Sequence, residues 1–201
     1  MDRHCHILPG VDDGAASMEE ALALIRAMKA VGFVGACCTP HIMQRFPNTP
    51  ERLQERFLAL AELAVQESFQ LRLAAEYMVD EGFEHAISHH TPLLWEGTHL
   101  LVELPQYMLP PGWMDSLLLV RRLGYVPVLA HPERYGRLLS VEELVELTEQ
   151  GILLQGNTGS ICGYYGRRVQ AIAAELHRRG LYYCWGTDAH SVEMLQRVVR
   201  S

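Results

Sequence analysis

Short apolar runs alternate with amphipathic runs along the whole chain, and this alternation restricts the possible folds more than any other feature of the sequence. The apolar runs have the length of buried strands, and we expect strands at residues 2–6, 33–39, 71–77, 99–104, 126–130, 152–156 and 182–187. An amphipathic run follows each of them, and we expect helices at residues 17–31, 50–68, 80–88, 112–123, 140–149, 165–179 and 191–199. Repeated strand–helix units predict an α/β fold with a parallel sheet, either an open doubly wound sheet or a closed barrel.

Two of the expected helices have recognisable first turns. Ser17 followed by Glu20, and Ser140 followed by Glu143, have the spacing of a capping box. The sequence after the first strand has no G-x-G-x-x-G pattern, so a dinucleotide-binding version of the fold lacks its main marker.

The composition is that of a globular protein, and we expect one domain over residues 1–201. The net charge is −7 and no block of Lys and Arg stands out, so we expect no nucleic-acid partner. No apolar run has the length of a membrane-spanning helix, so we expect no membrane insertion. The five cysteines form no C-x-x-C pair and lie mostly in apolar runs, which indicates reduced thiols in a cytoplasmic protein.

Ionisable side chains lie where the expected strands end. They are His4, His6, His41, Glu76, Glu103, His131, Glu133, Arg134, Asp188 and His190, with Asp12 and Asp13 in the loop after the first strand. The carboxyl ends of parallel strands meet at one face, so we expect these groups to converge. Imidazole and carboxylate together suit Mn, Fe, Zn or Co, and about nine ligands require two or three ions. The sequence therefore predicts a multinuclear metal centre.

Each of these residues has a simpler explanation when it is taken alone. A single histidine such as His131 is more often a hydrogen-bonded core residue than a ligand. His4 and His6 share one face of a strand because side chains alternate, which directs Cys5 to the other face. Five further histidines lie outside the pattern and are expected to be solvated or structural: His85, His89, His90, His99 and His177.

The segment "CGYYGRR" contains a cysteine and an arginine whose spacing needs a separate explanation. Cys162 and Arg168 have the bare spacing of a loop in which a thiolate attacks phosphate and an arginine holds its oxygens. Ile161 stands where such loops usually carry histidine, and Gly166 falls one position late. We therefore expect only a loop that leads into the helix at 165–179.

Six motifs occur in order across nearly the whole chain: "DRHCHILPGVDDGA", "CTPH", "AAEY", "LLVELP", "VLAHPERY" and "GTDAH". Together they resemble the PHP (polymerase and histidinol phosphatase) superfamily. Within it, "HCHILPGVDDGA" with "AHPERY" resembles the bacterial manganese-dependent protein-tyrosine phosphatases of the CpsB type. The resemblance implies a distorted (β/α)7 barrel of the TIM-like PHP fold.

The resemblance also implies a site with two or three divalent ions, most simply Mn²⁺, with Fe, Zn, Co or Mg as alternatives. The implied ligands are His4, His6, Asp13, His41, Glu76, Glu103, His131, Asp188 and His190. Glu76 would be shared. His4, His6 and Asp188 would complete one site, Glu103 and His131 a second, and Asp13, His41 and His190 a third. Arg134 matches an arginine that contacts substrate phosphate.

One part of the chain departs from the family pattern. Relatives usually carry Arg-Pro-Pro shortly after the last Asp-x-His, and its arginine also binds phosphate. Here the sequence continues "DAHSVEMLQRVVRS", and the spacing of Arg197 differs from that pattern, so whether it stands in for the second arginine is left open.

The activity implied by the resemblance is hydrolysis of a phosphomonoester by metal-activated water, with Asp13, His41 or His190 protonating the leaving group. The implied partner is the phosphotyrosine tail of a bacterial tyrosine kinase that controls capsular or extracellular polysaccharide synthesis. The alternatives are a small-molecule phosphatase of the histidinol-phosphate kind and a metal-loaded regulatory protein with weak catalysis.

Overall fold

The computed structural model describes residues 1–200, and every strand pair in it is parallel. A three-stranded sheet contains, in order, β1 (Asp2–Cys5), β2 (Gly35–Cys38) and β4 (Gln70–Leu73). A six-stranded sheet contains, in order, β3 (His41–Ile42), β5 (Glu76–Met78), β6 (His99–Glu103), β7 (Val126–Ala130), β8 (Leu153–Asn157) and β9 (Tyr182–Gly186). The expected α/β fold with parallel sheets is confirmed.

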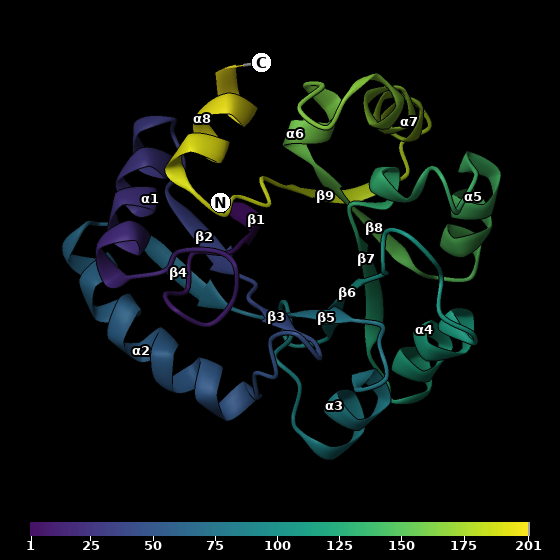
Figure 1. The fold of residues 1–201 in the computed structure, drawn as a ribbon, viewed down its shortest axis with the longest axis horizontal. Coiled ribbons are helices and arrows are strands. Elements are labelled where there is room, and N and C mark those ends of the chain that lie inside the picture. Colours follow the sequence, from purple (N-terminus) through teal and green to yellow (C-terminus); the bar gives the residue numbers. More distant parts are fainter. Residues whose placement is uncertain (201) are drawn as a thin grey trace.

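Helices connect the strands and lie outside the sheets (Figure 1). They are α1 (Met18–Ala30), α2 (Pro50–Gln66), α3 (Phe83–His89), α4 (Trp113–Arg122), α5 (Val141–Glu149), α6 (Thr158–Ile161), α7 (Arg167–Arg178) and α8 (Val192–Arg200), with the 3-10 helix η1 (Pro132–Tyr135). All seven expected helices are present to within a few residues, while the short α6 and η1 were not expected. Of the described residues, none belongs to a helix long and apolar enough to span a membrane.

The expected capping boxes form at one helix completely and at the other in part. The Ser140 hydroxyl accepts from the backbone N–H of Glu143, and the Glu143 carboxylate accepts from the backbone N–H of Ser140. At α1 the Ser17 hydroxyl accepts from Glu20, but the Glu20 side chain accepts from the backbone of Ala16. Both arrangements satisfy N–H groups that the first helical turn leaves free.

The strand expected at 71–77 is divided between the two sheets, and the strand expected at 33–39 is followed by a short strand, β3, in the other sheet. The chain leaves β2 at Cys38, passes Thr39 and Pro40, and continues as β3 in the other sheet. The strand expected at 71–77 forms β4 and then β5. The backbone hydrogen bond from Glu76 N to Pro40 O, 3.0 Å long, keeps the two segments paired across the break. Proline has no N–H to donate, so a ladder is interrupted there at small cost.

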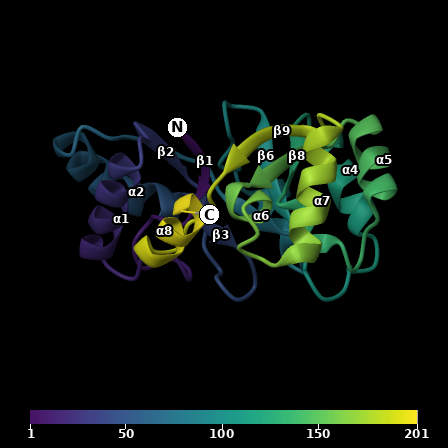
Figure 2. The same cartoon turned by 90° about the horizontal axis from the view of Figure 1, so that it is seen from above.

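The last strand lies beside the first, although they are at opposite ends of the sequence (Figures 1 and 2). Cys5 and Ala189 form a parallel bridge. His6 N donates to Ala189 O at 3.0 Å, and Asp188 N donates to His4 O at 2.8 Å. This pairing brings the motif at the C-terminal end of the chain next to the motif at its start.

Candidate metal centre

The site begins with the alternation of side chains along β1. His4 and His6 are fully buried and point to the same side, with their Nε2 atoms 3.1 Å apart. The Cys5 thiol points away and donates to the carbonyl of Cys37. Two imidazole nitrogens that face each other at this distance are better placed to share a cation than to bond to each other.

Glu76 lies at the centre of the site and is fully buried. Its Oε2 atom lies 3.2 Å from His4 Nε2, 3.3 Å from His6 Nε2 and 3.2 Å from His41 Nδ1. Its Oε1 atom lies 3.2 Å from His131 Nε2. One carboxylate therefore faces four imidazoles that come from three different strand ends.

Asp188 approaches the same centre from the segment after β9. Its Oδ1 atom lies 3.5 Å from His4 Nε2 and 3.3 Å from His6 Nε2. Its Oδ2 atom accepts from Arg134 at 3.0 Å and from the Asn157 side-chain amide at 2.8 Å. The hydrogen bonds to Oδ2 fix the carboxylate and leave Oδ1 directed at the two histidines.

Glu103, at the end of β6, completes the inner side of the site. Its Oε1 atom lies 3.6 Å from His131 Nε2, and its Oε2 atom lies 3.7 Å from His41 Nδ1. Glu103 Oε2 and His41 Nδ1 are both buried and have no hydrogen-bond partner among residues 1–200. Buried polar atoms without partners are costly, and a metal ion between them would supply the missing partner.

Asp13 and His190 form the outer side of the site. Asp13 Oδ1 lies 3.4 Å from His190 Nε2 and 3.6 Å from His41 Nε2. The side chains of Asp13 and His190 are 44% and 26% exposed, whereas the inner residues are nearly inaccessible. These two groups are therefore the ones that an incoming ligand meets first.

The donor atoms form three compact groups, each with ligand atoms within 4.8 Å of one another. The groups are His4, His6 and Asp188; His41, Glu76 and Glu103; and His6, Asp13, His41 and His190. Two ligands bound at about 2.1 Å to one ion lie at most about 4.2 Å apart, so the measured separations fit bound ions after small adjustments. Nitrogen and carboxylate oxygen donors suit Mn, Fe, Zn or Co.

Crowding of ionisable groups shifts their pKa values in opposite directions. Burial and the Glu76 carboxylate raise the pKa of Glu103 well above its usual range. Burial opposes ionisation of Glu76 too, but the His4 and His41 imidazoles lower its pKa well below the usual range. Burial lowers the pKa of His41 to about 4, whereas at His4 the effect of burial is outweighed by nearby carboxylates, which raise its pKa to about 9. These groups cannot all be charged together without cations between them.

Sequence reasoning missed the residues that orient the histidines. Asp12 Oδ2 accepts from His6 Nδ1 at 3.0 Å, and Gln155 Oε1 lies 2.7 Å from His4 Nδ1. Groups behind a ligand histidine fix its ring and its tautomer. Asp12 was visible beside Asp13, but nothing in the sequence showed which of the two aspartates faces the centre. Gln155 lies inside an apolar run, and that was the only signal it gave.

Two site residues have a backbone conformation that is rare for residues other than glycine. His131 has φ of 34° and Asp188 has φ of 55°. Each such residue costs roughly 1–3 kcal/mol, and such residues concentrate at functional sites. Here the strained backbone directs both side chains into the centre immediately after their strands end.

A cavity of about 420 Å³ opens onto the metal-ligand side chains. Arg134 lies in its wall, with its guanidinium 4.8 Å from the Tyr165 ring centre and bonded to Asp188. Arg45 lies in the wall as well, over the Phe46 ring. The remaining wall is largely apolar: Met43, Phe46, Met78, Pro105 and Tyr107.

Arg197, the open candidate for the second arginine, lies on helix α8. Arg197 pairs with Glu193 on the same face of α8, and among the described residues it does not belong to the cavity wall. Arg45, in the loop after β3, is instead the second arginine of the wall.

The segment around Cys162 does not form a phosphate loop. Cys162 ends the short helix α6, and the Arg168 guanidinium donates to the backbone carbonyl of Gly136. Neither residue belongs to the wall of the metal cavity as far as the structure describes it.

Comparison with known proteins agrees with this geometry. The model of a family described as "Capsular polysaccharide synthesis, CpsB/CapC" matches residues 1–198. This chain belongs to the CpsB/CapC family.

Characterised members of the CpsB/CapC family are named as phosphatases. The chain is 29% identical to the tyrosine-protein phosphatase YwqE of Bacillus subtilis, over 96% of this chain and 78% of YwqE. It is 29% identical to the tyrosine-protein phosphatase CpsB of Streptococcus pneumoniae, over 96% of this chain and 84% of CpsB. This chain also superposes on a solved structure with a TM-score of 0.83 and 26% sequence identity. That structure comes from work that describes YwqE of B. subtilis and CpsB of S. pneumoniae as "unique metal-dependent tyrosine phosphatases". The superposition covers 99% of this chain and 85% of the solved chain.

Proposed function

We propose that this chain is a metal-dependent protein-tyrosine phosphatase. The observation that carries the proposal is the convergence of buried imidazoles and carboxylates below a cavity whose wall holds Arg134 and apolar side chains. Metal ions held at this end of the cavity would attract a phosphate group, and the apolar side chains of its wall would suit an aromatic ring. The family and the named activity of its members support the same conclusion.

The centre would hold two or three divalent ions, Mn²⁺ in the first place. The ligands are the nine residues expected from the sequence: His4, His6, Asp13, His41, Glu76, Glu103, His131, Asp188 and His190. Glu76 would be shared, because its Oε2 atom faces His4 and His41, which belong to different groups, and its Oε1 atom faces His131. Ions bound there acidify water and neutralise charge on the transferring phosphoryl group.

Arg134 binds the substrate phosphate and orients it. Its bond to Asp188 and its contact with Tyr165 hold the guanidinium in place before substrate arrives. Guanidinium groups make charge-assisted hydrogen bonds to phosphate oxygens. Arg45 supplies the second positive charge that relatives obtain from the segment after the last Asp-x-His. Phe46 and Tyr107 contact the aromatic ring of the substrate.

Asp13, His190 and His41 handle the proton that the leaving group requires. Asp13 and His190 are at the opening, where the leaving oxygen departs, and their side chains are the accessible ones. His41 lies behind them and contacts Asp13, so it acts through Asp13 rather than directly. A phenolic leaving group has a pKa near ~10, so it needs less help than an alkoxide would.

The physiological substrate in this proposal is the phosphotyrosine tail of a bacterial tyrosine kinase that controls capsular or extracellular polysaccharide synthesis. The description of the family supports a role in capsule synthesis.

We also propose that the protein acts in the cytoplasm as one domain over residues 1–201. Its five free thiols are consistent with a reducing compartment. Its two sheets act as one distorted (β/α)7 barrel of the PHP kind, a proposal supported by the pairing of β1 with the segment after β9.

The test is hydrolysis of a phosphotyrosine peptide by chelator-stripped protein with and without added Mn²⁺. We expect activity only after the metal is restored. Activity that survives stripping would contradict the proposal and direct attention to Cys162. Metal binding without turnover of the peptide, followed by turnover of histidinol phosphate, would favour the small-molecule alternative. Binding without turnover of either would favour a regulatory protein.

A further inference from the structure

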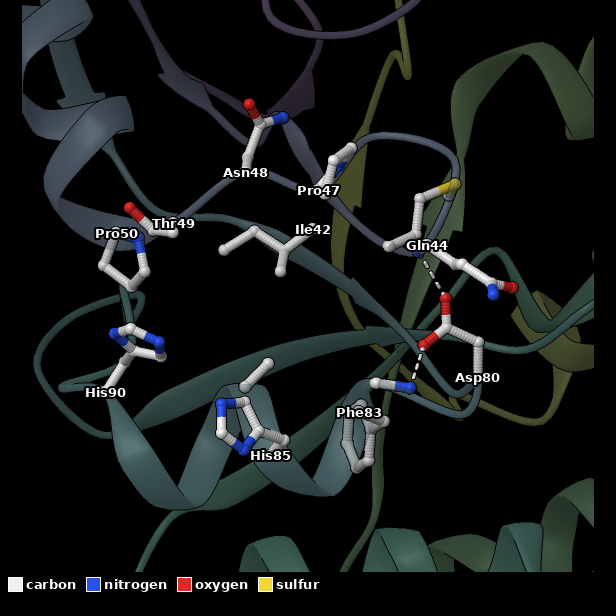
Figure 3. A pocket seen from close by; sticks show the side chains of 13 residues that line it. Ile42, Gln44, Pro47, Asn48, Thr49, Pro50, Asp80, Phe83, His85 and His90 are labelled. Atoms are coloured by element: carbon white, nitrogen blue, oxygen red, sulfur yellow. Dashed lines mark hydrogen bonds between the residues drawn. The ribbon is translucent and has the colours of Figure 1, made fainter.

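A second pocket lies next to the metal cavity, between the segment 42–47 and helix α3 (Figure 3). Its volume is about 310 Å³, at the small end of the range for ligand pockets. Its apolar lining consists of Ile42, Met43, Pro47, Pro50, Phe83 and Ala86. None of these residues is a proposed ligand of the metal ions.

One thin wall separates this pocket from the metal cavity. His41 and Ile42 are successive residues of β3, so their side chains point to opposite sides. His41 lines the metal cavity and Ile42 lines the second pocket, while Met43 lines both. Further along the same segment, Phe46 lines the metal cavity and Pro47 lines the second pocket. A chain that lies across Met43 therefore reaches both spaces.

Hydrogen bonds hold the wall at a fixed position. Met43 N donates to Phe46 O at 3.1 Å, which closes the loop on itself. The Asp80 carboxylate accepts from the backbone N–H groups of Gln44 at 2.7 Å and Gly82 at 2.9 Å (Figure 3). Asp80 follows β5, the strand that carries Glu76 into the metal centre. The spacing between the pocket and the centre is thus set by strand β5.

We propose that the second pocket is a substrate subsite that receives an apolar side chain of the peptide whose phosphotyrosine occupies the metal cavity. The inference rests on the proposed phosphatase function and adds a sequence preference to it. An extended peptide advances roughly 3.3 Å per residue, so a side chain a few positions from the phosphotyrosine crosses Met43 and enters the pocket. The occupant is apolar because the buried side chains of Ile42 and Phe83 line the pocket and the Asp80 carboxylate already accepts two hydrogen bonds.

The experiment uses the Mn²⁺-loaded full chain and phosphotyrosine peptides in an alanine background. A single leucine is moved through the positions on either side of the phosphotyrosine, and a small aryl phosphate serves as a substrate that is too short to reach the pocket. We expect one leucine position to raise kcat/KM by roughly tenfold over the all-alanine peptide, because apolar surface is buried there. The aryl phosphate reports whether the metal centre itself is intact.

Two pairs of variants locate the effect. Ala86→Trp fills the pocket from helix α3, and Ser88→Trp places the same side chain on an exposed position of that helix. His85→Asp puts a negative charge at the pocket, and His89→Asp is its control. Both histidine variants remove the same stacked ring pair, whose centroids are 4.2 Å apart, and they place the new charge at different positions. His85→Asp also removes the edge contact with the His90 ring.

We expect Ala86→Trp and His85→Asp to abolish the leucine preference and leave aryl phosphate hydrolysis unchanged, while both controls behave as wild type. Absence of a leucine preference in the wild type would overturn the subsite, and so would a preference that survives in both pocket variants. Failure of the wild type to hydrolyse any of the substrates would instead refute the proposed phosphatase function.

Discussion

Asparagine at position 12 would keep the shape of the aspartate and reverse the hydrogen-bonding character of one side-chain atom. Asp12 Oδ2 accepts from His6 Nδ1 and from the backbone N–H of His41, both at 3.0 Å, and Oδ1 accepts from the backbone N–H of Gly14 at 2.9 Å. All three partners are therefore donors. Whichever way the amide of the variant turns, its NH₂ group faces at least one N–H and cannot bond to it.

The size of the effect follows from the place of Asp12 behind the metal centre. Its carboxylate fixes the tautomer of His6 that leaves Nε2 free to bind a metal ion. Loss of such a group typically lowers metal affinity or activity by about 10–100-fold. This corresponds to about 1.4–2.8 kcal/mol of binding free energy. The protein should still fold, because the side-chain volume is unchanged.

The assay is calorimetric titration of Mn²⁺ into chelator-stripped Asp12→Asn protein, with kcat/KM for a small aryl phosphate measured in parallel. Asp115→Asn, an exposed substitution of the same kind on helix α4, is the control and should match the wild type. Wild-type Mn²⁺ affinity and wild-type kcat/KM in Asp12→Asn would refute the idea that this carboxylate orients His6 for metal binding.

Four further outcomes are expected. Adding Mn²⁺ at about 100 times its Kd to stripped protein should raise the free energy of unfolding by about 2.7 kcal/mol, seen as a higher Tm in calorimetry, whereas an unchanged Tm would count against a built metal site. Arg134→Ala should raise KM for an aryl phosphate by about 10–100-fold in steady-state assays, with Arg134→Lys in between. Gly186→Ala should lower the free energy of unfolding by about 1–3 kcal/mol in urea titrations, because the new methyl carbon would lie within 2.8 Å of His4 N. Cys162→Ser should retain Mn²⁺-dependent turnover within about twofold, and a large loss would revive the thiolate mechanism.

The parallel α/β architecture could be predicted from the sequence because it depends on local patterns. Apolar runs of strand length, helix caps such as Ser140 with Glu143, and the order of the elements all act over a few residues. The division of the strand expected at 71–77 between two sheets was missed, and so was the short strand β3. A proline such as Pro40 can end a strand, or the strand can continue after it with one backbone hydrogen bond missing. Which of the two occurs depends on the neighbouring strand, and that neighbour is distant in sequence.

The candidate ligands were predictable for a related reason. Strand periodicity placed His4 and His6 on one face, and a rule of parallel sheets placed Glu103 at the same edge. Glu76 was expected at the end of a strand but begins β5, where the chain has just passed from one sheet to the other. The groups around the ligands were not predictable. Asp12, Gln155 and Arg45 reach the site through turns and contacts that their neighbours in sequence do not encode.

The sequence by itself determined which side chains are available and on which side of each strand they lie. Only the tertiary structure decided their distances, because these depend on the pairing of β1 with the segment after β9. It also decided the positive φ angles that direct His131 and Asp188 inward, since packing around the site must maintain a conformation that the isolated chain avoids. Metal binding and phosphate recognition need atoms placed to within about 0.5 Å, and that precision comes from long-range packing.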